Sequence, residues 1–213
     1  MASRRAVIDR QAIVVAFDMC SSSNIIDDLT KSGNVGRLPV FFTAIERYLA
    51  ARQIDAVPFH PYKFTGGGWV LLFPDRTDGA KLLRFLEGMC LSFAVEFRRS
   101  LLPSLSRKPA LVGLTFGIER GELIPITFHG QQEYVGRSIN VACRLQAALK
   151  DKGGSPAYSA LMSESVYRAC FAQTKPHRVN KVTRNLRNID GGAQFACRRV
   201  WLLRPFEAAD ETG

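Results

Sequence analysis

The sequence lacks the long apolar runs of a membrane-spanning or secreted protein. Its apolar stretches, such as 12–17 and 69–73, are of strand length and fall well short of the ~20 residues that cross a bilayer. Residues 1–10 carry charges but no apolar stretch long enough for a secretory signal. We therefore expect a cytoplasmic protein with no membrane partner.

Paired cysteines are also lacking. The 5 cysteines are an odd number, lie far apart and include no Cys-x-x-Cys pair. A disulfide framework or a zinc site is therefore not expected, and free thiols fit a reducing compartment. The sequence has no internal repeat and no linker rich in glycine, serine and proline. Its 213 residues therefore predict one domain.

Acidic residues are fewer than basic ones: the chain has 19 Asp and Glu residues, 29 Lys and Arg residues and a net charge of +10. This excess favours polyanionic partners such as nucleotides, nucleic acid or an acidic protein surface. Much of it lies in 175–187, where basic residues alternate with Val, Leu and Asn, a pattern typical of the solvated face of a twisted hairpin. A nucleic-acid partner is disfavoured, because the sequence has neither a basic run interleaved with aromatics nor a recognisable reading helix.

The hydrophobic pattern predicts an α+β fold. Strands are expected at 11–18, 54–64, 69–73, 111–119, 122–129 and 157–162 and in a terminal hairpin over 179–203. Helices are expected over 25–29 (capped by a preceding Ser or Asn), 38–51, 78–101, 136–150 and 163–172. Turns at 66–68, 120–121 and 191–192 predict three hairpins. This order is typical of an antiparallel sheet with helices packed on one face.

Asp18 ends the first predicted strand and is followed by a small polar run at 20–24. A carboxylate in that place can hold a hard cation beside a triphosphate, and the amides of a helix N-terminus suit phosphate oxygens. Taken alone, however, an aspartate at a strand end is more often a helix or turn cap.

Two further segments could contact a ligand. The glycines at 66–68 allow either a tight turn or the close approach of a ligand. Asn140 and Arg144 lie four residues apart and share a helix face with Arg137. An Asn-x-x-x-Arg pair is also common on solvent-facing helices.

Together these segments resemble the class III nucleotide cyclases, the adenylate/guanylate cyclase homology domains. Phe17-Asp18-Met19 is similar to the family's first metal segment, 63–73 to its Lys-x-x-Gly-Asp-Gly hairpin, and 136–145 to Gly-x-x-Val-Asn-x-Ala-x-Arg-Leu. Segments 161–167 and 186–189 are similar to later family signatures. The resemblance covers about residues 11–203, which leaves 1–10 and 204–213 as tails.

The resemblance implies a ferredoxin-like, cyclase-type sheet and a head-to-tail homodimer. A nucleoside triphosphate would bind between the subunits with two Mg²⁺ or Mn²⁺ ions. It assigns the metal to Asp18 and the Met19 carbonyl, the ribose to Asn140, and the charge at the transferred phosphate to Arg144. The phosphate-binding residues would be Cys20, Ser21, Ser22, Ser23 and Arg187, and the base-selecting residues Lys63, Glu133 and Tyr62, the last narrowing the pocket.

Within the family, Asp-x-Cys-Ser-Ser-Ser and Thr-Gly-x-Gly-Trp are most similar to the stand-alone pyrimidine cyclases of the Pycsar antiphage system. This likeness implies conversion of UTP, ahead of CTP, to the 3′,5′-cyclic monophosphate as an antiphage second messenger. It also implies a separate effector that senses the cyclic nucleotide, and activation by a signal outside this chain.

Gly67 departs from the family pattern, because the second metal-binding aspartate is expected at this position. Asp75 and Asp78 are expected past the far end of the strand, too distant to replace it. Loss of an electrostatic element from a phosphoryl-transfer site commonly costs ~10³–10⁵ in rate, so this chain should be severely impaired. Either Gly67 marks a degenerate, non-catalytic nucleotide-binding or regulatory dimer, or an Asp→Gly change inactivates an otherwise complete site. Retention of Asp18, Asn140, Arg144 and Arg187 favours the second reading, since a long-degenerate site should have lost more of them.

Overall fold

A computed structural model describes residues 10–55, 57–149, 155–174, 176 and 178–203. The strands are β1 (Gln11–Met19), β2 (His60–Phe64), β3 (Gly68–Pro74), β4 (Leu114–Glu122), β5 (Ile124–Phe128), β6 (Gln131–Val135), β7 (Ser159–Ser163), β8 (Arg178–Arg184) and β9 (Phe195–Trp201). The helices are α1 (Ser22–Lys31), α2 (Arg37–Asp55), α3 (Gly79–Glu96), α4 (Arg137–Ala148) and α5 (Glu164–Val166). Single π-helical turns extend α3 over Phe97–Leu101 and α5 over Tyr167–Phe171. The predicted tails lie almost wholly outside the described residues.

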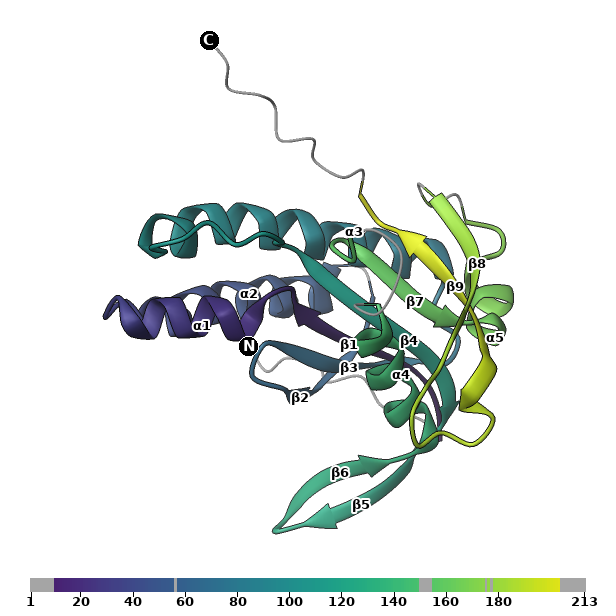
Figure 1. Cartoon of the computed structure of the whole chain (residues 1–213). Helices are drawn as coiled ribbons and strands as arrows, with labels where there is room; N and C mark the ends of the chain where they lie inside the picture. The colour runs from purple at the N-terminus through teal and green to yellow at the C-terminus, as the bar shows by residue number, and fades with distance from the viewer. Residues whose placement is uncertain (1–9, 56, 150–154, 175, 177, 204–213) are drawn as a thin grey trace.

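Seven strands form one sheet in the order β2-β3-β1-β4-β7-β9-β8 (Figure 1). All neighbours are antiparallel except β4 and β7. A parallel pair needs a long crossover, and α4 lies in the connection between these two strands. The predicted class, an α+β fold with a largely antiparallel sheet, is therefore confirmed.

The helices divide between the two faces of the sheet, so the expectation that they share one face is wrong. Ile13, Val15 and Phe17 of β1 belong to the larger core cluster, together with buried residues of α1, α2 and α3. The alternate residues of β1 are small, and they pack on the other face with Ala142 of α4. Because side chains alternate along a strand, β1 is buried on both faces, and so it reads as an unbroken apolar run.

Two of the three predicted hairpins are present. β2 pairs with β3 across the glycine turn, and β8 pairs with β9 around Gly191. The hairpin predicted at 120–121 is wrong, because β4 continues through this dipeptide to Glu122 and pairs with β1 and β7. Gly121 serves a close approach to α4 instead, since a Cβ there would lie 3.2 Å from Ser138 Cβ.

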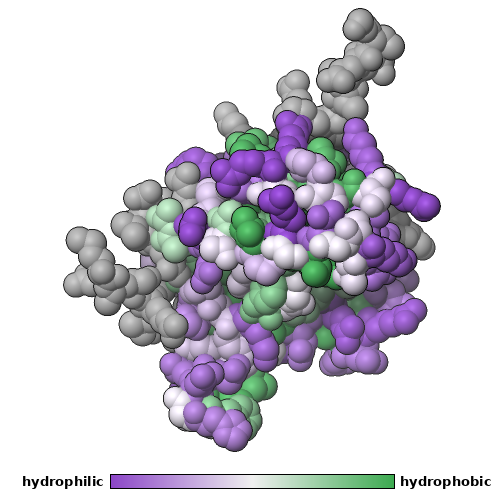
Figure 2. All heavy atoms as spheres, turned by 90° about the vertical axis from the view of Figure 1, so that its left-hand side faces the viewer, coloured by the Kyte–Doolittle hydropathy of each residue, from purple (hydrophilic) through white to green (hydrophobic). Residues whose placement is uncertain are grey.

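The hairpin that does occur beyond β4 is formed by β5 and β6, and we call it the arm. Its two-residue turn has positive φ at His129 (48°) and Gly130 (75°), the geometry that suits the twist of a hairpin. The arm projects from the body of the molecule (Figure 1). Its exposed apolar side chains are Ile124, Phe128 and Val135. On the side of the molecule in Figure 2, the lower protrusion carries hydrophobic as well as hydrophilic atoms.

Candidate nucleotide and metal site

Asp18 lies near the end of the central strand β1, between the glycine turn and the start of β4. It is opposite Gly68 on one side and Thr115 on the other. The next two amides of the chain fix its place, because Met19 N–H donates to Gly67 O at 3.1 Å and Cys20 N–H donates to Gly113 O at 2.8 Å. The sheet thus holds a half-buried carboxylate near the end of an interior strand.

The structure brings Asp18, Gly67 and Ser22 together around one small space. A Cβ built on Gly67 would overlap Asp18 Oδ1 and would lie 3.1 Å from Ser22 Cβ and 3.3 Å from Ser22 Oγ. The second family aspartate would therefore project into the space that the Asp18 carboxylate borders. The two predicted metal positions are thus adjacent, although the residue at one of them has no side chain.

The three glycines of the turn differ in what an added side chain would meet. Gly66 has φ of 90°, a conformation that other residues rarely adopt. A Cβ on Gly68 would overlap Phe17 O, so this glycine permits β3 to approach β1. Gly67 is the only one of the three at which added atoms meet side chains alone.

The three serines after Cys20 differ in where their side chains lie. Ser21 has φ of 57°, and its hydroxyl donates to Leu111 O at 3.0 Å, so it does not cap α1 as expected. Ser22 borders the space beside Asp18, whereas Ser23 is exposed. The N-terminus of α1 thus has no side-chain cap, which leaves the amides of its first turn suited to an anion.

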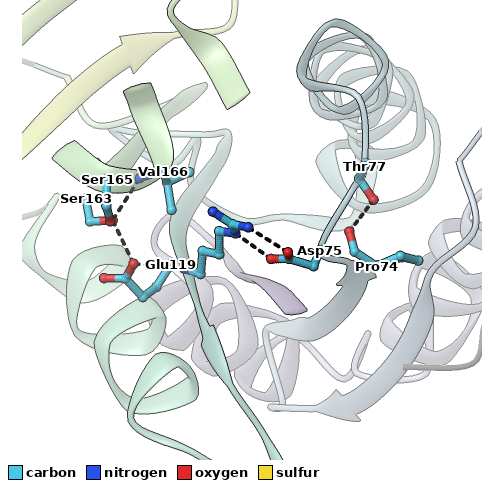
Figure 3. Close-up of polar contacts among 8 residues, drawn as sticks. Pro74, Asp75, Thr77, Glu119, Ser163, Ser165 and Val166 are labelled. Atoms are coloured by element: carbon cyan, nitrogen blue, oxygen red, sulfur yellow. Dashed lines mark hydrogen bonds and ion pairs between the residues drawn. The ribbon is translucent and has the colours of Figure 1, made fainter. Parts of the chain in front are cut away.

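The two acids that follow β3 lie at the end of that strand far from Asp18, because Asp18 is opposite Gly68 whereas Pro74 is opposite Ala12. Asp75 forms a two-pronged ion pair with Arg120, including an Arg120 Nη2–Asp75 Oδ2 contact of 2.6 Å (Figure 3). Arg120 lowers the pKa of Asp75. Asp78 caps α3 by accepting from Lys81 N–H at 2.8 Å. Neither carboxylate replaces the one missing at Gly67.

Two of the three predicted base-selecting residues, Tyr62 and Glu133, meet where the arm contacts β2. Tyr62 OH donates to Glu133 Oε2 at 2.7 Å and accepts from Tyr134 N–H at 3.1 Å. Burial, and secondarily the hydrogen bond to Glu133, raises the pKa of Tyr62, so this hydroxyl stays a donor. Lys63 is exposed and pairs with Val70 after an irregularity in β2. The structure thus joins Tyr62 to Glu133, 71 positions apart, with Lys63 next to Tyr62.

Asn140 and Arg144 lie on the exposed face of α4, while Val141, Ala142 and Leu145 form its buried face. Arg137, predicted on the same stripe, donates to Asp190 O at 3.1 Å. Arg187 is exposed beside the buried Leu186, whose N–H donates to Gly192 O at 2.8 Å. Arg144 and Arg187 therefore face solvent, where a ligand can contact them.

Sequence reasoning missed the polar contacts that seat α4 on the sheet. Gln146 Nε2 donates to Thr115 Oγ1 at 2.7 Å, and Thr115 Oγ1 donates to Asp18 O at 3.2 Å. Gly117 lies directly under the helix, because a Cβ there would overlap Ala142 O and Gln146 N. The only signal in the sequence is a threonine and a glycine at alternate positions of an apolar strand.

A buried carboxylate was missed as well. Glu119 is 5% exposed, and it accepts from Ser163 Oγ at 2.7 Å and from Arg120 N–H at 2.8 Å (Figure 3). Burial raises its pKa, against the opposing effects of these donors and of Arg137. Ser163 also caps α5, so Glu119 joins β4 to the start of that helix.

The residues present fit one hard cation better than two. Carboxylate and hydroxyl oxygens are among the ligands that Mg²⁺ prefers, and Asp18 and Ser22 supply one of each here. Among the described residues no group of three or more His, Cys, Asp or Glu side chains is placed to hold a metal ion.

No helix in the part of the chain that the structure describes is long and apolar enough to cross a membrane.

Known proteins were compared with the chain by sequence and by structure. No protein-family model and no curated protein matches its sequence. Among solved structures, the guanylyl cyclase Cya2 has a TM-score of 0.67 at 15% identity over 93% of this chain and 95% of its own. The adenylyl cyclase CyaB from P. aeruginosa has a TM-score of 0.65 at 16% identity over 92% and 95%. An adenylate cyclase from Trypanosoma brucei, solved in its monomeric state, has a TM-score of 0.63 at 13% identity over 93% and 94%. The chain therefore has the fold of adenylyl and guanylyl cyclase domains.

Proposed function

We propose that this chain is a nucleotide cyclase that binds a pyrimidine nucleoside triphosphate, UTP ahead of CTP, between two protomers. One observation carries the proposal. In a cyclase fold, Asp18 and Ser22 border one space with Gly67, at the uncapped N-terminus of α1. A carboxylate beside free helix amides suits a cation and the triphosphate that shares it.

At the α-phosphorus, the reaction forms one bond and breaks one. The ribose 3′-oxygen bonds to the α-phosphorus, the bond from that phosphorus to the oxygen bridging to the β-phosphate breaks, pyrophosphate leaves, and the hydroxyl proton passes to water. Asn140 orients the ribose, Arg144 balances charge at the α-phosphate, and Arg187 holds the triphosphate. Bound Mg²⁺ or Mn²⁺ would supply acidification of the 3′-hydroxyl and further charge balance.

The exposure of Asn140 and Arg144 supports a head-to-tail homodimer. Both side chains stand on the solvent face of α4, where a nucleotide held by a second protomer can meet them. The apolar side chains of the arm provide a surface for such a contact. Each site would then take Asp18 from one protomer and Asn140 and Arg144 from its partner.

The proposed preference for a pyrimidine rests on the cluster at β2. Tyr62 OH is hydrogen-bonded to the carboxylate of Glu133, and Lys63 is the next residue of β2. A tyrosine ring at this position would leave less room for a purine than for a pyrimidine. An equimolar mixture of the four nucleoside triphosphates tests this directly. Mainly cUMP or cCMP is expected, and mainly cAMP or cGMP would contradict the proposal.

Gly67 makes the chain as it stands a poor catalyst, and its replacement tests the enzymatic role. We expect Gly67→Asp to raise cyclic nucleotide production by roughly 10³-fold or more in Mg²⁺ or Mn²⁺. The double variant Asp18→Asn, Gly67→Asp serves as the matched inactive control. No product from Gly67→Asp in either cation would overturn catalysis as the function of this site.

A non-catalytic nucleotide-binding or regulatory dimer is the second candidate. It is favoured by the position of the Asp18 carboxylate, which borders the place of the missing aspartate. This alternative expects nucleotide binding and dimerisation without turnover, even after Gly67→Asp.

In the cell, we propose that the cyclic product acts as an antiphage second messenger in the cytoplasm and is sensed by a separate effector. The likeness of 18–23 and 65–69 to the Pycsar pyrimidine cyclases supports this role. Phage challenge of cells carrying the gene with and without Gly67→Asp tests it, since protection should follow cyclase activity.

A further inference from the structure

The space beside Asp18 is built differently from a site that holds two metal ions. Where a second carboxylate would project, Gly67 has no side chain and Asp18 Oδ1 borders the gap. On its other side stands Ser22, whose Oγ is 3.3 Å from the place a Cβ of Gly67 would take. Two side-chain oxygens, one charged and one neutral, thus border one small volume.

Two adjacent cations would lack the negative charge that they need. In two-metal sites the ions lie about 3.5–4 Å apart, so their mutual repulsion must be offset by ligands shared between them. Asp75 and Asp78 follow β3 at its end far from Gly68, where Asp75 is paired with Arg120 and Asp78 caps α3, so neither supplies this charge. A single Mg²⁺, in contrast, is ordinarily held by one or two carboxylates, substrate phosphates and water.

We infer that this chain binds one divalent cation per nucleotide, held by Asp18 and the Ser22 hydroxyl, in place of the two that its resemblance to the cyclases implies. The inference rests on the proposed nucleotide site. Ser22 serves the role that a serine or threonine hydroxyl has on Mg²⁺ in phosphate-binding loops. A single-cation site also gives a physical reason for the low turnover expected with Gly67, because one cation cannot serve both the attacking and the leaving oxygen.

The contacts of the three neighbouring serines identify Ser22 as the proposed cation ligand. The Ser21 hydroxyl is bonded to Leu111 O, and Ser23 is exposed on the next position of the helix. Ser22 lies nearest to the position of the missing carboxylate, with its Cβ and Oγ 3.1 and 3.3 Å from the place of a Gly67 Cβ. Its place in the first turn of α1 also brings the helix amides to the same ligand.

The test counts Mn²⁺ on the protein saturated with α,β-methylene-UTP, with α,β-methylene-ATP in parallel. Binding of each analogue is measured first by calorimetry, and bound Mn²⁺ is then counted by equilibrium dialysis. Electron paramagnetic resonance separates isolated Mn²⁺ from two coupled ions. We expect one isolated Mn²⁺ per bound analogue in this chain, and two coupled ions in Gly67→Asp.

Substitutions then assign the ligands. Ser22→Ala should weaken Mn²⁺ binding by at least roughly tenfold, and Asp18→Asn by more. Thr30→Ala removes a hydroxyl from the same helix, one that donates to Ile26 O, and should leave the Mn²⁺ affinity unchanged. Thermal unfolding of each variant checks that the fold is intact.

The outcomes separate the two proposals. Two Mn²⁺ per bound analogue in the parent chain would overturn the single-cation site while leaving the nucleotide site in place. Unchanged Mn²⁺ affinity in Ser22→Ala would overturn the assignment of Ser22. Failure of both analogues to bind would overturn the proposed function and this inference with it.

Discussion

At the scale of one residue, the Tyr62 hydroxyl connects two of the side chains proposed to select the base. Its hydrogen bond directs Glu133, and two further bonds to the Tyr134 backbone hold the ring in place. The phenol stays protonated because burial and Glu133 raise its pKa. The acceptor presented to a base is therefore oriented by the arm as well as by β2.

We expect Tyr62→Phe to reduce discrimination between the UTP and ATP analogues by roughly tenfold, since a hydrogen bond to a charged group is worth about 1.5–3 kcal/mol. Calorimetric affinities for the two analogues measure the effect. Tyr134→Phe is the matched control, because only backbone atoms of Tyr134 take part in these bonds. Equal discrimination in Tyr62→Phe and the parent would show that the hydroxyl has no part in selection.

Glu119 makes stability depend on pH with a definite sign. Burial raises its pKa, so the folded chain binds this proton more tightly than the unfolded chain. The free energy of unfolding should therefore fall as pH rises from the ordinary glutamate value of about 4.3 through the raised one. Glu119→Gln cannot lose a proton and should not show this loss.

Urea unfolding at pH 5 and pH 7.5 measures the difference between the parent and Glu119→Gln. We expect the parent to lose stability relative to the variant over this interval. Glu122→Gln removes a charge from the exposed end of the same strand and serves as the control. A difference that is the same at both pH values would contradict the raised pKa.

At the scale of elements, the seat of α4 on β4 decides where Asn140 and Arg144 stand. Gly117 lets the helix backbone approach the strand, and Gln146 and Thr115 connect the helix to the Asp18 carbonyl. The helix that would serve a partner's site is thereby fixed to the strand that carries the chain's own carboxylate. A shift of α4 therefore alters both parts of a dimeric site.

Gly117→Ala should destabilise the fold by about 3 kcal/mol or more, because the added methyl meets the backbone atoms Ala142 O and Gln146 N, which cannot rotate away. Denaturant titration gives the value. Gly36→Ala adds the same methyl where no heavy atom lies within 4 Å, and it should cost little. Equal stability of the two variants would refute the close packing of α4 on β4.

The elements most accurately predicted were those with a strong local pattern. The apolar run of β1, the turn at Gly66 and the periodicity of α4 each depend on neighbours in sequence. The arm was missed because its turn uses His129 and Gly130, a weaker signal than the Arg120-Gly121 pair that lies inside β4. Gly121 allows a close approach to Ser138 of α4, a contact between elements that no local pattern reveals.

For the candidate site, the sequence predicted which residues take part, and the structure supplied how several of them lie relative to one another. The hydrogen bond between Tyr62 and Glu133 connects β2 to the arm. The short distance between Gly67 and Ser22 depends on the register of β1 with β3. The role of Thr115 and Gln146 could not be predicted, because it depends on how closely α4 approaches the sheet. Such relations follow from tertiary packing, which residue spacing alone does not encode.

At the scale of the whole molecule, the proposed site is complete only when two protomers meet. Asp18 lies near the end of β1, whereas Asn140 and Arg144 are exposed on α4. If each site takes its carboxylate from one protomer and its cation from the other, two different inactive variants should complement each other. A site built within one protomer could not be rescued in this way.

Mixing Asp18→Asn with Arg144→Ala, both in the Gly67→Asp background, provides the decisive measurement. Random reassortment makes about half of the dimers mixed, each with one complete site and one doubly deficient site, so about a quarter of all sites should turn over. Each variant alone should be nearly inactive, and a mixture of Arg144→Ala with Asn140→Ala should stay so, because both defects then lie on the same half of the site. Cyclase activity that never exceeds that of the separate variants, despite exchange of protomers shown by sizing, would place all three residues in one subunit's site.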